Sequence, residues 1–276
     1  MLAVVAHRTH GTNALLAERA GGVILSPRAA IAMLDRGDLA IGRLDVRPSL
    51  EGIERGLSSL RRLEERGVRI LNDADALIAM HDKLVTALRL RAAGVAQPRT
   101  GYLPPDANDR GIALPAVVKP RFGSWGRHVH RCETRKELRA CLRLLRKERW
   151  FRAQGAIVQE LVPPTGCDLR VLVAGAEVIG AVERRAAPGE WRTNISLGGI
   201  RLPARAGAKA RTLALRAAAA VGADLTGVDL LPVGDDWVVL ELNGAVDFNH
   251  AYRPEGDVFD DAVRALRRSA IERIAA

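Results

Sequence analysis

The stretch Gly227–Phe248, GVDLLPVGDDWVVLELNGAVDF, decides the fold. It holds two apolar runs of strand length on either side of the turn sequence VGDDW, which predicts a hairpin whose second strand folds back beside the first. Because side chains alternate along a strand, Glu241 and Asn243 share one face of the second strand, and we expect Asp229 beside them on the first. A buried carboxylate without a partner costs several kcal/mol, so these oxygens require either cationic side chains or a ligand.

Two interpretations of this acidic group remain open at the level of the hairpin. Oxygen ligands on adjacent strands suit Mg²⁺, which keeps several waters and completes its octahedron with nucleotide phosphates. The chain is also rich in arginine, and salt bridges to arginine would compensate the same charges. Judged locally, a metal site and a salt-bridge network are equally supported.

The composition is that of an ordinary globular protein. The chain has 276 residues, 48% of them apolar, which is enough for a sizeable core. Its apolar runs are of strand length and interrupted by charge, so the sequence predicts no membrane-spanning segment, and its opening is too short for a signal peptide. The cysteines lie apart without a CxxC pattern, which argues against a zinc site or disulfides: Cys132, Cys141 and Cys167. We therefore expect a cytoplasmic protein.

The formal net charge of +10 would suit nucleic acid, a membrane surface or acidic small molecules. However, the basic residues are spread along the whole chain, and aromatic residues for stacking on bases make up only 4% of it. Nucleic acid is therefore a poorly supported partner. Nearly all basic residues are arginines, so the position of each lysine is informative.

The order of patterns along the chain predicts two domains. Residues 1–80 alternate short apolar runs with helical patterns, which is typical of an open α/β layer with a mostly parallel sheet. Within them, the spacing of apolar residues from Leu50 to Leu63 predicts an amphipathic helix. A helix is expected from about Asp82, followed by a segment rich in Pro, Gly and Asp at 97–111. The second predicted domain spans 81–276, divided into subdomains at about 98–160 and 161–276.

Three further features have both a functional and an ordinary reading. The GSWG loop between two predicted strands would let backbone amides approach phosphate oxygens, yet a plain hairpin turn is the favoured local reading. Arg184, Arg192 and Asn194 bracket a Pro-Gly loop. The planar guanidinium group of arginine suits carboxylate and phosphate groups, although in a chain this rich in arginine any single one is expected to be solvated. His7 and His10 follow the first strand and read as polar loop residues.

Taken in order, six segments resemble the ATP-grasp fold of the RimK-like ligases: HDKLVTALRLRAAGV, VVKPRFGSWGRHV, VQELVPPTGCDLRVLVAG, ERRAAPGEWRTNISLGG, GVDLL and VLELNGAVDF. The resemblance covers roughly residues 80–260, and its specificity lies in the order and spacing of the segments. Residues 1–80 resemble, in pattern only, the α/β domain that precedes the ATP-grasp in this family. The expected fold class is thus α/β (α+β), an ATP-grasp fold preceded by an N-terminal open α/β domain.

The resemblance implies a set of site residues. Two lysines would hold the ATP phosphates, Lys83 and Lys119. A mobile flap would cover them, formed by Gly123, Ser124 and Gly126. The hinge strand beside adenine would consist of Gln159, Glu160, Leu161 and Val162. Asp168 would contact the nucleotide nearby. Two Mg²⁺ (or Mn²⁺) ions, bridged by Glu241, would be bound by Asp229, Glu241 and Asn243. The γ-phosphate and the reacting carboxylate would lie near Arg184, Arg192, Thr193 and Asn194.

The implied reaction is ATP-dependent amide formation. A substrate carboxylate attacks the γ-phosphate of ATP, and an amine then displaces phosphate from the acyl phosphate. The resemblance favours glutamate or α-aminoadipate as the amine, and an acidic carrier protein, a peptide carboxyl terminus or a small cofactor as the acceptor. Alternatives from other classes are a non-catalytic basic protein that binds nucleic acid or anions, and an ATP-grasp phosphotransferase.

Some features stay outside this assignment. Many RimK-like members have a further glycine in the flap where this chain has Arg127 and His128, so flap mobility is expected to differ. The acceptor side of the site has only candidate residues, namely Asp247, Asn249 and His250. A homo-oligomer is compatible with the sequence, but no segment specifies an interface.

Overall fold

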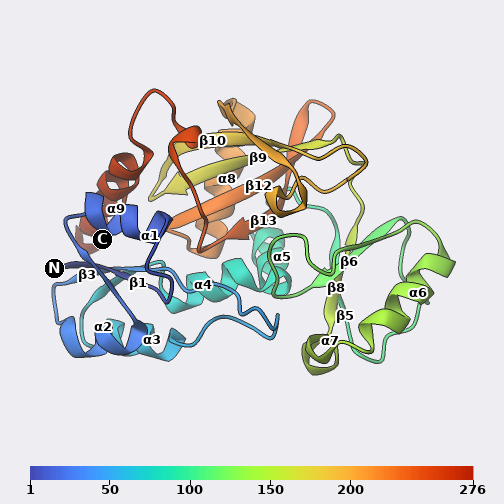
Figure 1. Cartoon of the computed structure of the whole chain (residues 1–276), viewed down its shortest axis with the longest axis horizontal. Coiled ribbons are helices and arrows are strands. Elements are labelled where there is room, and N and C mark those ends of the chain that lie inside the picture. Colours follow the sequence, from blue (N-terminus) through green and yellow to red (C-terminus); the bar gives the residue numbers. More distant parts are fainter. Residues whose placement is uncertain (276) are drawn as a thin grey trace.

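The computed structural model describes residues 1–275 and, among them, three sheets (Figure 1). The N-terminal sheet has the order β2-β1-β3-β4, and all its neighbouring strands run parallel, which confirms the predicted open α/β layer. Its strands are β1 (Leu2–Val5), β2 (Val23–Leu25), β3 (Leu39–Gly42) and β4 (Arg69–Leu71). The helices of this part are α1 (Thr12–Arg19), α2 (Pro27–Met33), α3 (Leu57–Glu65) and α4 (Ala74–His81).

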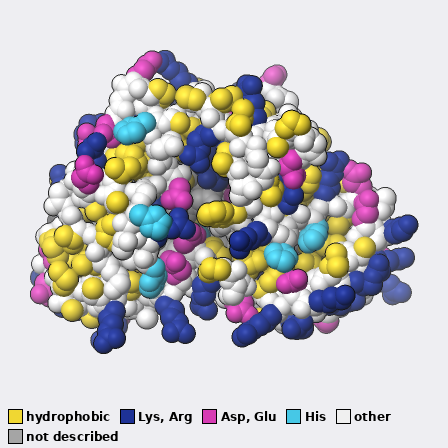
Figure 2. All heavy atoms as spheres, in the orientation of Figure 1, with side chains coloured by type: hydrophobic (Ala, Val, Ile, Leu, Met, Phe, Trp, Pro, Cys, Tyr) yellow, Lys and Arg dark blue, Asp and Glu magenta, His cyan; other side chains and the backbone are white. Residues whose placement is uncertain are grey.

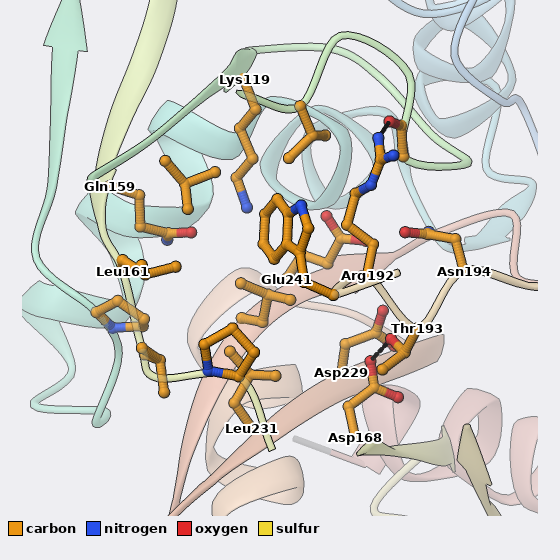
Figure 3. A pocket seen from close by; sticks show the side chains of 18 of the residues that line it. Lys119, Gln159, Leu161, Asp168, Arg192, Thr193, Asn194, Asp229, Leu231 and Glu241 are labelled. Atoms are coloured by element: carbon orange, nitrogen blue, oxygen red, sulfur yellow. Dashed lines mark hydrogen bonds between the residues drawn. The ribbon is translucent and has the colours of Figure 1, made fainter. Parts of the chain in front are cut away.

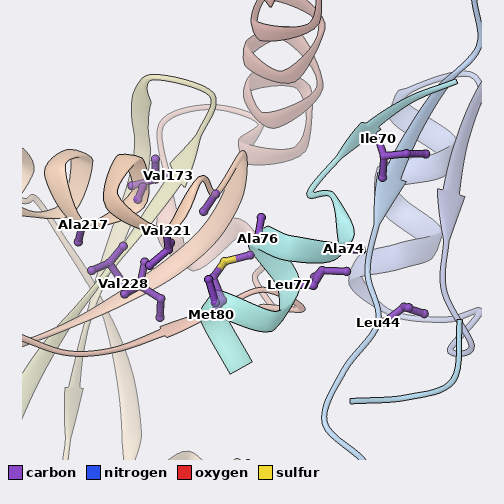
Figure 4. Packing of buried hydrophobic residues seen from close by; sticks show 14 of the residues in the cluster. Leu44, Ile70, Ala74, Ala76, Leu77, Met80, Val173, Ala217, Val221 and Val228 are labelled. Atoms are coloured by element: carbon purple, nitrogen blue, oxygen red, sulfur yellow. The ribbon is translucent and has the colours of Figure 1, made fainter. Parts of the chain in front are cut away.

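Two helices of this part differ from the sequence-based expectation. Helix α3 begins at Leu57 and not near Leu50, because the preceding turns contain backbone at positive φ, including Gly56 at 130° and Leu50 at 60°. Helix α4 was not predicted, since its apolar residues surround the helix and leave no stripe. It lies in the core between two layers, where Met80 faces Val228 and Leu77 lies toward Leu44 (Figure 4).

The second sheet, which we call the small sheet, carries the flap. Its order is β5-β8-β6-β7, and the segment between β6 and β7 is the predicted flap. The strands are β5 (Thr100–Leu103), β6 (Ala116–Pro120), β7 (His130–Cys132) and β8 (Ala156–Glu160). Helix α6 has the capping box predicted for Thr134 and Glu137. The helices that precede and accompany this sheet are α5 (Lys83–Ala92), α6 (Arg135–Leu145) and α7 (Arg149–Gln154).

The third sheet, the large sheet, is antiparallel with the order β11-β10-β9-β12-β13. Its strands are β9 (Cys167–Ala174), β10 (Glu177–Arg185), β11 (Ile200–Ala204), β12 (Leu225–Val233) and β13 (Asp236–Asn243). Strand β11 was not predicted, because it is a half-exposed edge strand that contains a proline and shows no apolar alternation. Helix α8 (Ala208–Val221) packs on this sheet, and α9 (Val258–Ala275) packs against α1.

The hairpin that opened the sequence analysis is β12–β13. Val233 pairs with Asp236 across the turn, and Asp229 lies directly opposite Glu241, as predicted. Asn243 is opposite Gly227, two positions further along the ladder. The domain limits at residues 80 and 160 stay a prediction. Within residues 1–275, no helix has both the length and the apolar character needed to cross a membrane.

Candidate active site

A cavity lies between the small sheet and the large sheet, closed on one side by the flap (Figure 3). It is lined by residues from β6, β8, β9, β10, β12 and β13 and by the loop 186–199. Of the site residues implied by the resemblance, the fold brings all but Asn243 to this one cavity. Positions from Lys83 to Glu241 thus converge on a single space, although the role of each residue stays a prediction.

One end of the cavity is apolar and follows the predicted hinge. Leu161 and Val162 face apolar side chains from other elements, which the sequence analysis did not single out: Val117, Trp191, Leu231 and Pro232. The side-chain amide of Gln159 is turned into the small sheet, where it donates to Thr100 Oγ1 at 2.9 Å. Leu231 was detectable in principle, because it shares a strand face with Asp229.

The other end of the cavity holds two lysines. Lys119 on β6 is 4% exposed, and its ammonium group makes no hydrogen bond or salt bridge within residues 1–275. It points into the cavity toward Glu241 (Figure 3). Lys83, at the start of α5, donates to the flap carbonyl of Gly123 at 2.6 Å and lies 3.8 Å from Glu241 Oε2. This end therefore presents two cations to an anionic ligand.

The titration of Lys119 gives a testable pH dependence. Burial lowers the pKa of Lys119 to about 8, an effect that Glu241 opposes and Lys83 reinforces. Only the charged form attracts phosphates, so nucleotide affinity should fall about tenfold between about pH 7 and about pH 9. Calorimetric titration with a non-hydrolysable ATP analogue measures this. In Lys119→Arg the side chain stays charged and the dependence should vanish; an affinity of the unmodified protein that is flat over this range contradicts the role.

The predicted flap is hydrogen-bonded to the loop 186–199. Ser196 Oγ donates to the carbonyl of Trp125 at 2.9 Å, and Arg192 Nη1 donates to the carbonyl of Gly126 at 2.8 Å. Arg192 is oriented by Glu190, which accepts from its Nε at 3.0 Å and from its Nη2 at 2.7 Å. These hydrogen bonds, against a small cost of burial, lower the pKa of Glu190 to about 2. Glu190 was missed by the sequence analysis, although it lies two residues before Arg192.

The backbone of the flap is unusual for its composition. Trp125 and His128 adopt positive φ values of 69° and 53°, which non-glycine residues rarely do. A side chain at Gly126 would meet Asn194 Oδ1 at 2.8 Å, so glycine is required for this approach. The segment between β6 and β7 therefore combines positive-φ backbone at Trp125 and His128 with a close approach of Gly126 to the loop 186–199.

An arginine network occupies the floor of the cavity. Asp229 is 1% exposed and accepts from Arg170 Nε at 2.6 Å, from Arg170 Nη2 at 2.7 Å and from Arg184 Nη2 at 2.8 Å. Arg184 also makes a two-pronged contact with Asp168, at 2.7 and 2.6 Å, and Thr193 donates to the same carboxylate. Burial alone would raise the pKa of Asp229, but the two guanidinium groups lower it to about 2. Asp229 therefore has the arginine partners that the salt-bridge interpretation expects, and its role as a metal ligand stays a prediction.

The same network changes the view of Asp168. The resemblance implied a nucleotide contact, whereas both carboxylate oxygens accept from Arg184 in the structure. Arg184 keeps its Nη1 free of hydrogen bonds within the described residues, and it lines the cavity. Asp168 therefore orients Arg184 toward the cavity.

The acidic side chains of the hairpin have the chemistry of a magnesium site. Glu241 has no arginine partner in the described part of the chain, and Asp229 Oδ1 accepts only one hydrogen bond, which leaves a lone pair. Asn243 donates its Nδ2 to Gly227 at 3.4 Å and does not line the cavity. Residues 1–275 hold no cluster of three or more carboxylate, His or Cys ligands, so phosphates would have to complete the coordination. The residues fit an ion shared with a nucleotide, with Glu241 as the readily available ligand.

Comparison with known proteins agrees with this geometry. A family model described as the RimK-like ATP-grasp domain matches residues 106–259. The ribosomal protein bS6–L-glutamate ligase of Escherichia coli O7:K1 is 33% identical over 224 residues, which cover 78% of this chain and 73% of the relative. A probable alpha-L-glutamate ligase of Klebsiella pneumoniae is 35% identical over 199 residues, covering 69% of this chain and 64% of the relative.

Solved structures share the fold at low sequence identity. A RimK-domain ATP-grasp protein from Sphaerobacter thermophilus has a TM-score of 0.68 at 20% identity, covering 96% of this chain and 99% of its own. The ATP-grasp ligase PsnB, solved with a minimal precursor, Mg and ADP, has a TM-score of 0.67 at 21% identity and covers 98% of both chains. With the family match and the bS6 ligase relationship, the arrangement of lysines, flap and acidic hairpin has a plain reading: the chain belongs to the RimK-like ATP-grasp family and is an ATP-dependent carboxylate–amine ligase.

Proposed function

We propose that this ligase joins the amine of L-glutamate to a carboxyl-bearing acceptor through an acyl phosphate, using ATP and Mg²⁺. The observation that carries the proposal is the convergence of the implied site residues, from Lys83 to Glu241, on one cavity. The choice of glutamate is supported by the relatives, which are named as glutamate ligases. The acceptor would be an acidic carrier protein, the carboxyl terminus of a peptide, or a small cofactor.

The two ends of the cavity would suit different parts of ATP. Adenine would lie in the apolar end beside Leu161 and Leu231, and the phosphates would lie near Lys83 and Lys119 under the flap. Magnesium, when bound, would neutralise charge on the transferring phosphoryl group. Its protein ligands would be Glu241, Asp229 and Asn243, and we propose that Glu241 bridges two ions. To bind an ion, the side chain of Asn243 would have to rotate away from the carbonyl of Gly227, to which it now donates a hydrogen bond.

The arginine network suits the chemistry of phosphoryl transfer. A carboxylate oxygen of the acceptor attacks the γ-phosphorus, the bond to ADP breaks, and an acyl phosphate forms. The amine nitrogen of glutamate then attacks the acyl carbon, phosphate leaves, and the nitrogen loses a proton. Arg184, held in place by Asp168, lines the cavity and has a nitrogen, Nη1, without a hydrogen bond among the described residues, so it would stabilise charge in both steps.

The hydrogen bonds to the flap would help to protect the acyl phosphate intermediate from water. An acyl phosphate is hydrolysed by water, so a closed lid raises the yield of amide. Arg192 and Ser196 hold the flap backbone in the closed position. Arg192 therefore acts on the flap in this arrangement, with Glu190 as its positioning residue.

The proposal is tested by an ATP-dependent screen read by mass spectrometry. L-glutamate, α-aminoadipate and other amino acids are offered with carrier-protein, peptide and cofactor acceptors. We expect one acceptor class to gain the mass of a glutamyl residue together with release of ADP. A phosphorylated product without amide would instead support a phosphotransferase. Salt-steep nucleic acid binding without turnover would support a binding protein.

A further inference from the structure

A third arginine lies beside the catalytic network without a partner. Arg201 on β11 is directly opposite Arg184 on β10, so the two side chains share a face of the large sheet, with Cβ atoms about 5 Å apart. The Nε of Arg201 is buried and has no hydrogen-bond acceptor, and the side chain forms no salt bridge within residues 1–275. Its guanidinium carbon lies 5.5 Å from the centre of the Tyr252 ring.

Tyr252 itself carries a second polar atom without a partner. It is 2% exposed, and its hydroxyl makes no hydrogen bond. It belongs to a 3₁₀ turn, His250–Tyr252, in the segment that follows β13 and covers β10 and β11. A buried hydroxyl left unpaired costs about 1–3 kcal/mol, so this position calls for a partner.

The charges on this face do not balance. Arg170, Arg184 and Arg201 carry three positive charges, whereas Asp168 and Asp229 carry two negative charges that are already bonded to the first two arginines. The nearest further carboxylate on the face, that of Glu241, pairs with Lys83. One guanidinium group, that of Arg201, is thus left for an anion. Figure 2 shows both basic and acidic side chains around the hollow in the middle of the face that it displays.

We propose that Arg201 and Tyr252 form a subsite for a substrate carboxylate next to the reacting centre. This inference rests on the proposed function and names where a substrate is held. The planar fork of arginine suits a carboxylate, and the tyrosine hydroxyl can donate one further hydrogen bond to it. The carboxylate could belong to the incoming amino acid or to the acceptor. An amino acid carries its α-carboxylate and its amine on the same carbon, so a carboxylate held beside Arg184 would bring the amine to the acyl phosphate.

The test compares Arg201→Gln and Tyr252→Phe with the matched control Arg185→Gln. Arg185 lies next to Arg184 on β10, is exposed, and pairs with Glu183. With ATP saturating, the KM for the substrate whose carboxylate is bound should rise about 100-fold in Arg201→Gln and about tenfold in Tyr252→Phe, since charge-assisted bonds contribute most. The KM for ATP should not change. Arg201→Lys should restore part of the loss, and the control should behave like the unmodified protein.

Further arms identify the source of the carboxylate. If the α-carboxylate of glutamate is the ligand, the effect of Arg201→Gln should disappear with the α-amide of glutamate. If the acceptor supplies it, the acceptor KM should rise and the glutamate KM should not. Either result supports the subsite. Unchanged KM values for both substrates in Arg201→Gln and Tyr252→Phe would overturn it.

Folding and function are separable in this design. The Tyr252 hydroxyl has no internal partner, so Tyr252→Phe should melt at the same or a higher temperature than the unmodified protein. Calorimetric titration with L-glutamate and with the acceptor, in the presence of a non-hydrolysable ATP analogue, needs no turnover. A protein that joins no amino acid would refute the proposed function, whereas these titrations would still decide whether Arg201 binds a carboxylate.

Discussion

Replacing Glu241 with alanine should lower the rate of amide formation by at least about a thousandfold, because it removes the proposed magnesium ligand that has no arginine partner among the described residues. Asp229 is expected to be the weaker ligand of the two, because both of its oxygens already accept hydrogen bonds from Arg170 or Arg184. ADP release and product mass, measured together, report the loss. Because Glu241 is only partly buried and its ion pair with Lys83 is 3.8 Å long, the variant should remain folded.

The matched control for Glu241 is Asp236→Asn. Asp236 lies on the same strand, is exposed, pairs with Lys209 and does not line the cavity. It should leave turnover unchanged. Binding of Mn²⁺ in the presence of a non-hydrolysable ATP analogue gives a readout independent of chemistry, and Glu241→Ala should weaken it strongly. A Glu241→Ala protein with normal turnover would refute the proposed mechanism.

Replacing Lys119 with alanine should weaken nucleotide binding by about 30- to 100-fold, equivalent to about 2–3 kcal/mol. The ammonium group is buried, charged and unpaired within the described residues, so a phosphate is the partner its position suits. Burial of the ammonium group disfavours its charged form and lowers the pKa of Lys119 to about 8. Removing the ammonium group should therefore not destabilise the fold through lost ionic contacts. Titration calorimetry and thermal melting measure the two effects separately.

Lys209→Ala controls for the loss of a lysine elsewhere. Lys209 is exposed and pairs with Asp236. It should bind nucleotide like the unmodified protein, and Lys119→Arg should recover part of the affinity. Equal affinity of Lys119→Ala and the unmodified protein would remove Lys119 from the phosphate site, while leaving the role of Lys83 to be tested in the same way.

Local patterns predicted much of the fold and failed where the signal was weak. The β12–β13 hairpin follows from apolar alternation around a turn, and the register places Asp229 opposite Glu241 as expected. Helix α4 was missed because a helix buried on all sides has no amphipathic stripe. The start of α3 was placed too early because the spacing of apolar residues does not report that Gly56 adopts a backbone unavailable to a helix.

The candidate site divides in the same way. The order of the motifs, which include the lysines, the flap and the acidic hairpin, predicted the family. The fold then brings these residues to one cavity. The partners of Asp229 and Asp168 could not be read from the sequence. Arg170 pairs with Asp229 across 59 positions of chain, and Thr193 reaches Asp168 from a loop. In a chain with so many arginines, no local feature distinguishes these from the solvated ones.

The sequence by itself determined the kinds of groups available. These are a carboxylate on the first strand of the hairpin, a carboxylate and an amide on one face of the second strand, few lysines, and a glycine loop between strands. Only the tertiary structure decided how their charges are balanced. The order β11-β10-β9-β12-β13 places Arg201, Arg184, Arg170, Asp229 and Glu241 on successive strands of one face. Arg170 and Arg184 therefore pair with Asp229, whereas Glu241 and Arg201 have no such partner among the described residues. The physical reason is that electrostatic interaction depends on distance and burial, and both are set by strand order and register, not by spacing along the chain.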